Sequence, residues 1–183
     1  MSSTHFFQPG DQVVYPNHGV GIIEAIQPAS NGQGDYYLLH IAASNLRVLV
    51  PQANAASVGL RPLSSVAQAE LVLSYLEDAV PAAIVAARPG DWKGRFRENS
   101  SKLGHGSLSD VAQVLKGLAQ LHQSKRLSFR EKKMLDHAVL LLASELASTE
   151  HLSFPQALSL IEAALTKATL ALPPLDDDVA AAS

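Results

Sequence analysis

The spacing of apolar residues changes once along the chain, near Leu63, and this change constrains the fold most strongly. Before Leu63, short β-branched runs alternate with turn sequences such as Pro16-Asn17-His18-Gly19. The expected strands are residues 11–15, 20–26, 35–41, 46–51 and 57–63. Five strands in about 50 residues leave no room for crossover helices, so we expect an antiparallel sheet curled into a small barrel.

After Leu63, apolar residues recur at helical spacing. Expected helices begin at Ser65, at about residue 92 (ending near 103), after Ser107, and at the capping boxes that start with Ser128 and Ser153. Pro81, Pro89 and Gly90 are expected to interrupt the helical pattern over residues 79–91. The predicted fold class is α+β multidomain, with an SH3/Tudor-like β-barrel in residues 1–63, an all-α helical domain in 64–172 and a flexible acidic tail in 173–183.

The stretch YPNHGVGIIEAI, residues 15–26, contains a Gly-x-Gly pair that resembles part of a phosphate-binding loop. A dinucleotide fingerprint also needs a third glycine and a following helix. Here a strand-like run follows the glycines, which favours a turn between two strands. In that interpretation Gly19 supplies a positive φ, and Gly21 allows a bulge or close packing.

Several kinds of chemistry lack their sequence signatures. The chain has no cysteine, which excludes disulfides, thiolate catalysis and Cys-based metal sites. The seven histidines form no His-x-x-x-His or His-Glu-x-x-His pair, and there is no Gly-x-Ser-x-Gly elbow. We therefore expect no enzyme, no catalytic residue, no metal and no cofactor. With no signal peptide and no membrane span in the sequence, we expect a soluble cytoplasmic protein.

The formal net charge of −3 hides a strong division along the chain. Residues 88–133 contain eleven Lys and Arg against four Asp and Glu, a net charge of +7. Residues 1–87 have a net charge of −4, and residues 134–183 a net charge of −6. A polyanion that binds this chain would therefore bind its middle part.

Two segments of the N-terminal part, FQPGDQVVYPNHGVGIIEAI and YYLLHIAASNLRVLVPQANAASVGLRPL, resemble the N-terminal module of the CarD/CdnL family. That module is shared with the RNA-polymerase-interacting domain of transcription-repair coupling factors. Trp92, the basic run KGRFRENSSKL and the run LSFREKKMLDHAVLLLASELA look like the family's helical DNA-facing domain. The resemblance covers roughly residues 6–165, and we expect a stand-alone CarD-like regulator without the ATPase motor of a coupling factor.

The resemblance implies a bacterial transcription regulator. Its Tudor-like domain is expected to dock on the RNA polymerase β subunit, and its helical domain to contact promoter DNA at the upstream edge of the transcription bubble. There the family's Trp, at Trp92 here, acts as a minor-groove wedge that stabilises the open complex. We expect a monomer that binds DNA weakly and with little sequence specificity, and that associates with the nucleoid through RNA polymerase.

Trp92 is the only tryptophan and has Asp91 and Lys93 as neighbours, whereas a core tryptophan usually has apolar neighbours. Its ring can stack on a partly unstacked base step, and flanking cations can hold phosphates. The alternative is that Trp92 anchors its helix to the interface between barrel and helices, and that the cations form a solvated face. The candidate DNA-binding residues are Trp92, Arg88, Lys93, Arg95, Arg97, Lys102, Lys125 and Arg130.

The candidate RNA-polymerase-binding residues lie on one expected strand. They are Arg47, Leu49, Val50 and Pro51. The family has arginines near the positions of Ala29 and Leu49, so the individual contacts of this chain differ from the family pattern. Arg47 is two residues from Leu49, on the same strand face, and can replace a missing arginine. The alternative for Arg47 is an exposed charge of the barrel.

Two further functions compete with this interpretation. A stand-alone DNA-architectural protein would use the same basic helices and bind duplex DNA tightly without polymerase. A Tudor-like peptide-binding module would need an aromatic cage, for which Tyr15, Tyr36 and Tyr37 are the nearby candidates. Tyr36 and Tyr37 are adjacent in a strand, so they are expected to point to opposite faces.

Overall fold

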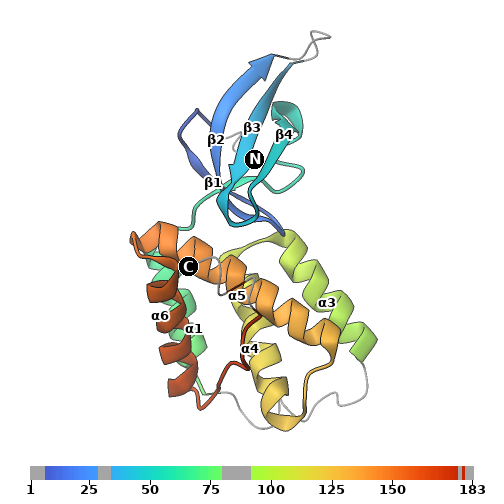
Figure 1. Cartoon of the computed structure of the whole chain (residues 1–183), viewed down its shortest axis with the longest axis vertical. Coiled ribbons are helices and arrows are strands. Elements are labelled where there is room, and N and C mark those ends of the chain that lie inside the picture. The colour runs from blue at the N-terminus through green and yellow to red at the C-terminus, as the bar shows by residue number, and fades with distance from the viewer. Residues whose placement is uncertain (1–6, 29–33, 80–91, 177–178, 180–183) are drawn as a thin grey trace. The chain divides into compact units, whose positions relative to one another are not determined.

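The chain divides after Leu63 into two compact units, residues 1–63 and residues 64–183 (Figure 1). The computed structural model describes residues 7–28, 34–79, 92–176 and 179. The first unit is an antiparallel sheet, and the second consists of helices. The predicted α+β fold class is confirmed.

The sheet contains five strands in the order β4-β3-β2-β1-β5, and all neighbouring pairs are antiparallel. The strands are β1 (Gln12–Tyr15), β2 (Gly19–Pro28), β3 (Asp35–Ile41), β4 (Leu46–Pro51) and β5 (Arg61–Pro62). The last strand is much shorter than the expected 57–63. Residues 52–60 instead form a 3-10 turn, η2 (Gln52–Asn54), and further turns, in which Leu60 N donates to Ala55 O at 2.9 Å. A second 3-10 turn, η1 (Ala42–Ser44), joins β3 to β4.

The Gly-x-Gly stretch forms the hairpin between β1 and β2. Tyr15 pairs with Gly19, and His18 N donates to Tyr15 O at 2.9 Å. Gly19 has φ +90°, a value that side-chain-bearing residues rarely adopt. A Cβ on Gly21 would lie 3.1 Å from the carbonyl oxygen of His40, so the neighbouring strand approaches closely there. The interpretation of this stretch as a turn is therefore confirmed.

One face of the sheet carries a small apolar core. Its central members come from alternate positions of the strands, as expected for a half-buried sheet. Tyr37 is buried in this core, and its hydroxyl oxygen accepts a hydrogen bond from Phe7 N at 3.1 Å. The buried residues of the cluster are Phe7, Val13, Ile23, Tyr37, Leu39, Val50, Ala55 and Leu60.

The helical unit contains five helices within the described residues: α1 (Val66–Glu77), α3 (Trp92–His105), α4 (Leu108–Ser124), α5 (Phe129–Glu150) and α6 (Phe154–Lys167). Ser65, Ser128 and Ser153 each form a capping box with the Gln or Glu three residues later. The Ser107 hydroxyl caps α4 by accepting from Asp110 N at 3.1 Å. The expected helix starts are thus confirmed. None of the helices that the structure describes is both long and apolar enough to cross a bilayer.

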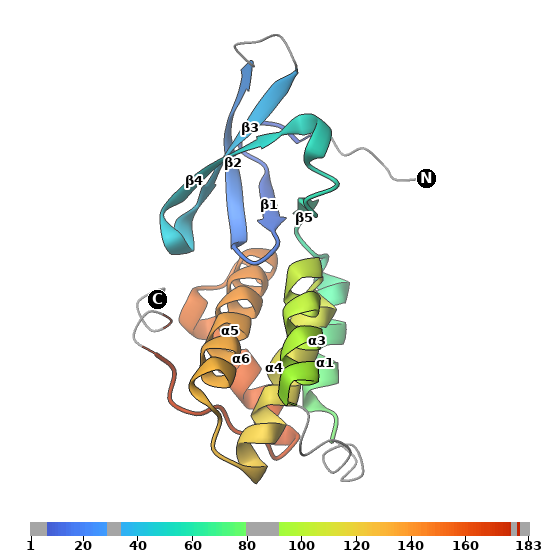
Figure 2. The same cartoon turned by 90° about the vertical axis from the view of Figure 1, so that its right-hand side faces the viewer.

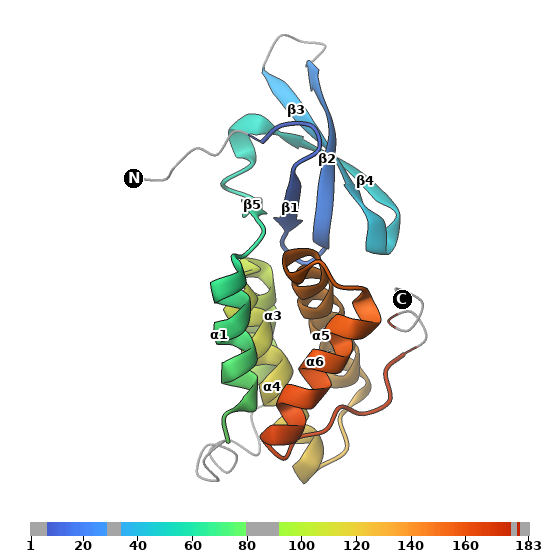
Figure 3. The same cartoon turned by 90° about the vertical axis from the view of Figure 1, so that its left-hand side faces the viewer.

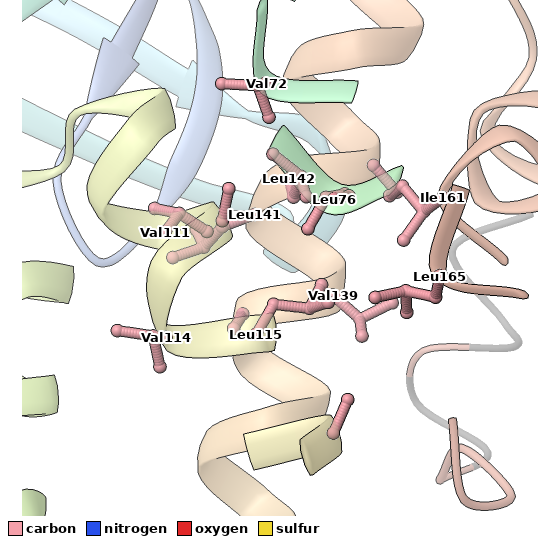
Figure 4. Packing of buried hydrophobic residues seen from close by; sticks show 14 of the residues in the cluster. Val72, Leu76, Val111, Val114, Leu115, Val139, Leu141, Leu142, Ile161 and Leu165 are labelled. Carbon is pink, nitrogen blue, oxygen red and sulfur yellow. The ribbon is translucent and has the colours of Figure 1, made fainter. Parts of the chain in front are cut away.

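Helix α5 is the centre of the helical unit. It packs against α4 and α6, while α1 packs against α6 and α4 (Figures 2 and 3). Figure 4 shows Leu115 of α4 and Leu165 of α6 on either side of Val139 of α5. Leu76 of α1 and Leu142 of α5 are also fully buried in this cluster. Because α3 packs chiefly against α4, it lies at the side of this core.

A buried lysine joins α4 to the end of α1. Lys116 Nζ donates to the carbonyl oxygens of Tyr75 and Asp78, the latter at 2.7 Å, and lies 4.4 Å from the Tyr75 ring centroid. Carbonyls at a helix C-terminus lack intrahelical partners and attract cations. Burial lowers the pKa of Lys116, but these oxygens provide partners for its ammonium group.

We expect Leu142→Ala to destabilise the helical unit by about 2–5 kcal/mol, because it removes a fully buried side chain between α5 and its neighbours. Denaturant unfolding followed by far-UV circular dichroism measures this change. Leu71→Ala is the control, because Leu71 is exposed and its truncation should change the free energy of unfolding by less than about 0.5 kcal/mol. Equal effects of the two substitutions would contradict the packing described above.

Candidate nucleic-acid interface

The N-terminal turns of α3 and α5 lie next to each other at one end of the helical unit (Figures 1 and 2). Arg95 in the first turn of α3 reaches Glu131 in the first turn of α5, with 3.9 Å between the guanidinium nitrogen and Oε1. Lys125, just before α5, also contacts this carboxylate, with its Nζ 3.3 Å from Oε1. Two basic segments that are about 30 residues apart in sequence therefore meet at Glu131.

Trp92 is the first residue of α3, and its side chain is half exposed, with 46% of its surface accessible. It shares a helical stripe with Phe96 and Leu103, which pack on the core of the unit. Side chains of a helix lean toward its N-terminus, so a ring on the first residue can extend past the core that the later residues cover. Lys93 Nζ lies 6.0 Å from the centroid of the Trp92 ring. A large aromatic surface is thus accessible beside a cation.

The other candidate cations of α3 differ in their surroundings. Lys93 and Arg97 are exposed, and the side chain of Arg95 is three-quarters buried. Lys102 Nζ lies 3.1 Å from Glu98 Oε1, one turn away. Arg88 lies outside the described residues.

The start of α5 supplies the remaining candidates and one residue that the sequence analysis did not single out. Lys125 and Arg130 are exposed. Phe129 is 77% exposed and lies 6.0 Å from Lys133 Nζ, measured to its ring centroid. In the sequence Phe129 is part of a capping box, which explains where α5 starts but does not show that the ring is uncovered. The sequence feature that could have indicated an exposed ring is the position of Phe129 within a basic run.

Glu131 is the acidic centre of this interface. Its burial would raise its pKa, but hydrogen bonds from the Ser128 backbone and hydroxyl and from Lys125 outweigh this effect, so the pKa is lowered. Ser128 N donates to Glu131 Oε2 at 2.8 Å. The carboxylate therefore stays ionised and balances part of the charge of Arg95 and Lys125.

The candidate polymerase-binding residues lie on β4 and alternate between its faces. Arg47 donates to both carboxylate oxygens of Glu24, at 2.9 and 3.1 Å, and this interaction lowers the pKa of Glu24. Leu49, on the same face, is 52% exposed. Val50 is only 3% exposed and its side chain lies in the sheet core, while Pro51 is half-buried.

Cross-strand neighbours extend this outer face. Arg47 pairs with His40 of β3, which pairs with Ile22 of β2. Ile22 is exposed, and His40 Nδ1 lies 3.6 Å from Glu24 Oε1. The face therefore combines exposed aliphatic side chains with a charge cluster. Ala29 lies outside the described residues.

The tyrosines required for an aromatic cage are not arranged as one. Tyr37 is buried in the sheet core, and its neighbour Tyr36 is on the other face and half-buried. Tyr15 stacks on His18, with 4.9 Å between the ring centroids. In the described part of the chain, no group of three or more His, Asp or Glu side chains is placed to hold a metal ion.

We expect the free energy of unfolding to depend on Glu131 in a defined pH range. Its pKa is lower in the folded state, so its stabilising contribution is present above the unfolded value, about 4.3, and is lost as the pH falls through the folded value. Glu131→Gln should lower stability at pH 7 by about 1 kcal/mol and make the acid-induced decline shallower than in the wild type. Denaturant unfolding between about pH 7 and pH 3 measures both effects. An unchanged slope would contradict this account.

Two domain-family models match the chain: the CarD-like/TRCF RID domain over residues 7–64 and the CarD C-terminal domain over residues 79–162. The chain is also 32% identical over 142 residues to a Bacillus subtilis (strain 168) protein named "Putative transcription factor YdeB". That alignment covers 76% of this chain and 90% of the relative. These matches support the expected assignment to transcription regulation. With both domain types present in order and a relative that aligns over nearly its whole length, the chain belongs to the CarD family.

Proposed function

We propose that this transcription regulator docks on the RNA polymerase β subunit through its sheet unit and stabilises the promoter open complex through its helical unit. The observation that carries the proposal is the half-exposed Trp92 ring at the start of α3, beside Lys93. The helical unit contacts the minor groove at the upstream edge of the transcription bubble. The chain acts as a monomer, in the cytoplasm and at the nucleoid, and needs no cofactor for this role.

Trp92 acts as a wedge at the edge of the melted DNA. Aromatic stacking on a base contributes roughly 1–3 kcal/mol, and an inserted apolar ring favours a base step that is already unstacked. The indole N–H can donate to a minor-groove acceptor. Lys93 and Arg97, both exposed, hold phosphates and fix the position of the helix on the DNA. Minor-groove readout is degenerate, so sequence specificity is slight.

Attachment to polymerase compensates for a modest intrinsic affinity for DNA. The whole chain has a net charge of −3 and a pI near 6.1, and several of its cations are already paired with carboxylates. Once the sheet unit is bound to polymerase, the helical unit meets the promoter at a high effective concentration. An affinity for melted DNA that exceeds the affinity for closed DNA by about 1.4 kcal/mol shifts the equilibrium tenfold toward the open complex.

The outer face of β2, β3 and β4 is the proposed polymerase-binding surface. Leu49 and Ile22 supply exposed apolar area, and Arg47 with Glu24 supplies charges that fix the orientation of a partner. The match of this unit to the CarD-like/TRCF RID domain supports the choice. Pro51 lies at the end of the same strand, and Val50 supports the surface from the core side.

We expect Trp92→Ala to shorten the lifetime of the promoter open complex about tenfold, because it removes a stacking contact made only with melted DNA. The lifetime is measured after addition of a competitor that captures free polymerase, and retention on immobilised polymerase is measured in parallel and should be unchanged. Leu160→Ala on α6 is the control, because Leu160 is partly exposed to a similar degree. An unchanged lifetime for Trp92→Ala would refute the wedge.

We expect Leu49→Ala to weaken retention on immobilised polymerase by about 1–2 kcal/mol, or roughly five- to thirtyfold in Kd. Val58→Ala is the control, because Val58 is an exposed apolar residue of the same unit outside the strands. Equal retention of both variants would exclude this face as the docking surface. Tight binding of the wild type to duplex DNA without polymerase would instead favour the stand-alone architectural function.

A further inference from the structure

Phe129 is an uncovered aromatic residue that the proposed wedge does not use. It is the first residue of α5, and its exposed fraction of 77% is the largest among the exposed large hydrophobic side chains that the structure describes. Leu71 is 70% exposed, but it follows Glu70 and has no basic residue near it in sequence. Phe129 by contrast precedes Arg130, and Lys133 Nζ lies 6.0 Å from its ring. A single exposed apolar residue needs no explanation, whereas an aromatic ring beside cations is a common nucleic-acid contact.

Lys132 and Lys133 have different roles although they are adjacent. The ammonium group of Lys132 contacts both carboxylate oxygens of Asp136, a buried residue of α5. Removing Lys132 would leave a buried carboxylate without that cation, so Lys132 has a structural role. Lys133 is half exposed and lies over the Phe129 ring. Lys133 is therefore the cation of this pair that can exchange its partner for an external one.

A carboxylate from the C-terminal segment already contacts Lys133. Asp176 Oδ2 lies 2.8 Å from Lys133 Nζ, and Asp176 Oδ1 lies 3.3 Å from Lys132 Nζ. Hydrogen bonds from Lys133 and then Lys132 lower the pKa of Asp176, so it is ionised at neutral pH. Asp176, a residue of the expected flexible tail, is thus held by two lysines of α5. Val179 N donates to Asp176 O at 2.9 Å, and Val179 is buried in the core of the helical unit.

The bound carboxylate shows what kind of ligand the position accepts. Two ammonium groups of α5 converge on the oxygens of one anion, as they would on the oxygens of a phosphate. The adjacent ring of Phe129 offers a flat apolar surface to a base. Phosphate and base occur together in nucleic acid. The start of α5 also lies beside the start of α3, so the position is at the same end of the unit as Trp92.

We propose that Phe129 and Lys133 form a second nucleic-acid contact site, and that Asp176 occupies this site as a built-in competitor when nucleic acid is absent. The inference rests on the proposed function for its ligand class, but it uses none of the residues assigned to the wedge. Phe129 stacks on a base, and Lys133 exchanges the Asp176 carboxylate for a backbone phosphate. Binding at this site therefore requires an internal ion pair to open, which lowers the affinity for isolated phosphates.

The first test removes the competitor. Binding of the full chain to a fluorescent DNA duplex with a central unpaired bubble is measured by anisotropy at low ionic strength. Asp176→Asn should tighten binding about two- to fivefold, the range expected for loss of an exposed ion pair. The matched control is Glu77→Gln, which removes one negative charge and a 2.7 Å ion pair with Lys167 elsewhere in the same unit. An equal gain in the control would mean that net charge alone is responsible, and would overturn the proposal.

The second test asks whether the gain acts through Lys133. In a Lys133→Gln background, Asp176→Asn should increase the DNA affinity by less than half as much as it does in the wild-type background. The reason is that Asp176 competes with DNA mainly for Lys133, which this background lacks. A gain of the same size in both backgrounds would overturn the assignment of Lys133. Circular dichroism and thermal unfolding of each variant show whether the fold is retained.

The third test concerns the ring. Phe129→Ala should weaken binding to the bubble DNA at least about fivefold, whereas Leu71→Ala, at similar exposure, should leave it unchanged. Equal binding of the two variants would exclude stacking by Phe129. If Trp92→Ala shortens the open-complex lifetime while Phe129→Ala and Asp176→Asn change nothing, the second site is wrong and the proposed function stands. If the reverse result is found, the wedge is wrong and the second site stands.

Discussion

The burial of α5 between α4 and α6 is the constraint on which the helical unit depends. Leu135, Val139, Leu142 and Leu146 are fully buried at helical spacing, so the orientation of α5 is fixed by its apolar stripe. Once this orientation is set, the first turn of α5 projects at one end of the unit, beside the first turn of α3. Uncovered rings and cations of both turns are presented there because the core holds the later turns of α5 and anchors α3 through Phe96 and Leu103.

Several charges in the basic segments of this unit are arranged as balanced pairs, while Lys93 and Arg97 are exposed beside them. At the starts of α3 and α5, Arg95 and Lys125 share Glu131, and Lys133 lies against Asp176. Lys102 lies against Glu98 in the later part of α3. The Lys133–Asp176 pair is more exposed than the pairs with Glu131; such a pair contributes little to stability, and its partners can be exchanged at low cost. In the proposed function, we expect such a surface to bind a polyanion with moderate affinity and to gain most from a ligand that is brought close by a second attachment. This property is consistent with a chain that carries a separate unit for binding a protein.

The sheet unit has a different kind of surface. Its apolar core is small, and part of its outer face is aliphatic: Ile22 and Leu49 are exposed around the Arg47–Glu24 pair. Arg47 donates to both carboxylate oxygens of Glu24, and this bidentate geometry limits the motion of the two side chains and fixes their charges on the sheet. In the proposed function, this outer face of exposed apolar area and fixed charges binds a protein partner, whereas the helical unit binds nucleic acid. The two units thus differ in the kind of surface that they offer.

The sequence by itself determined the elements, because their signals are local. Apolar spacing, the start signal at Ser65 and the capping boxes at Ser128 and Ser153 predicted the helices, and Gly19 predicted the hairpin turn. Only the tertiary structure decided the length of β5, the burial of the Val50 side chain and the exposure of Phe129. It also decided the ion pair between Lys133 and Asp176, which are 43 residues apart in sequence. Strand pairing, side-chain exposure and long-range ion pairs depend on which surfaces meet after folding, and the period of one segment does not contain that information.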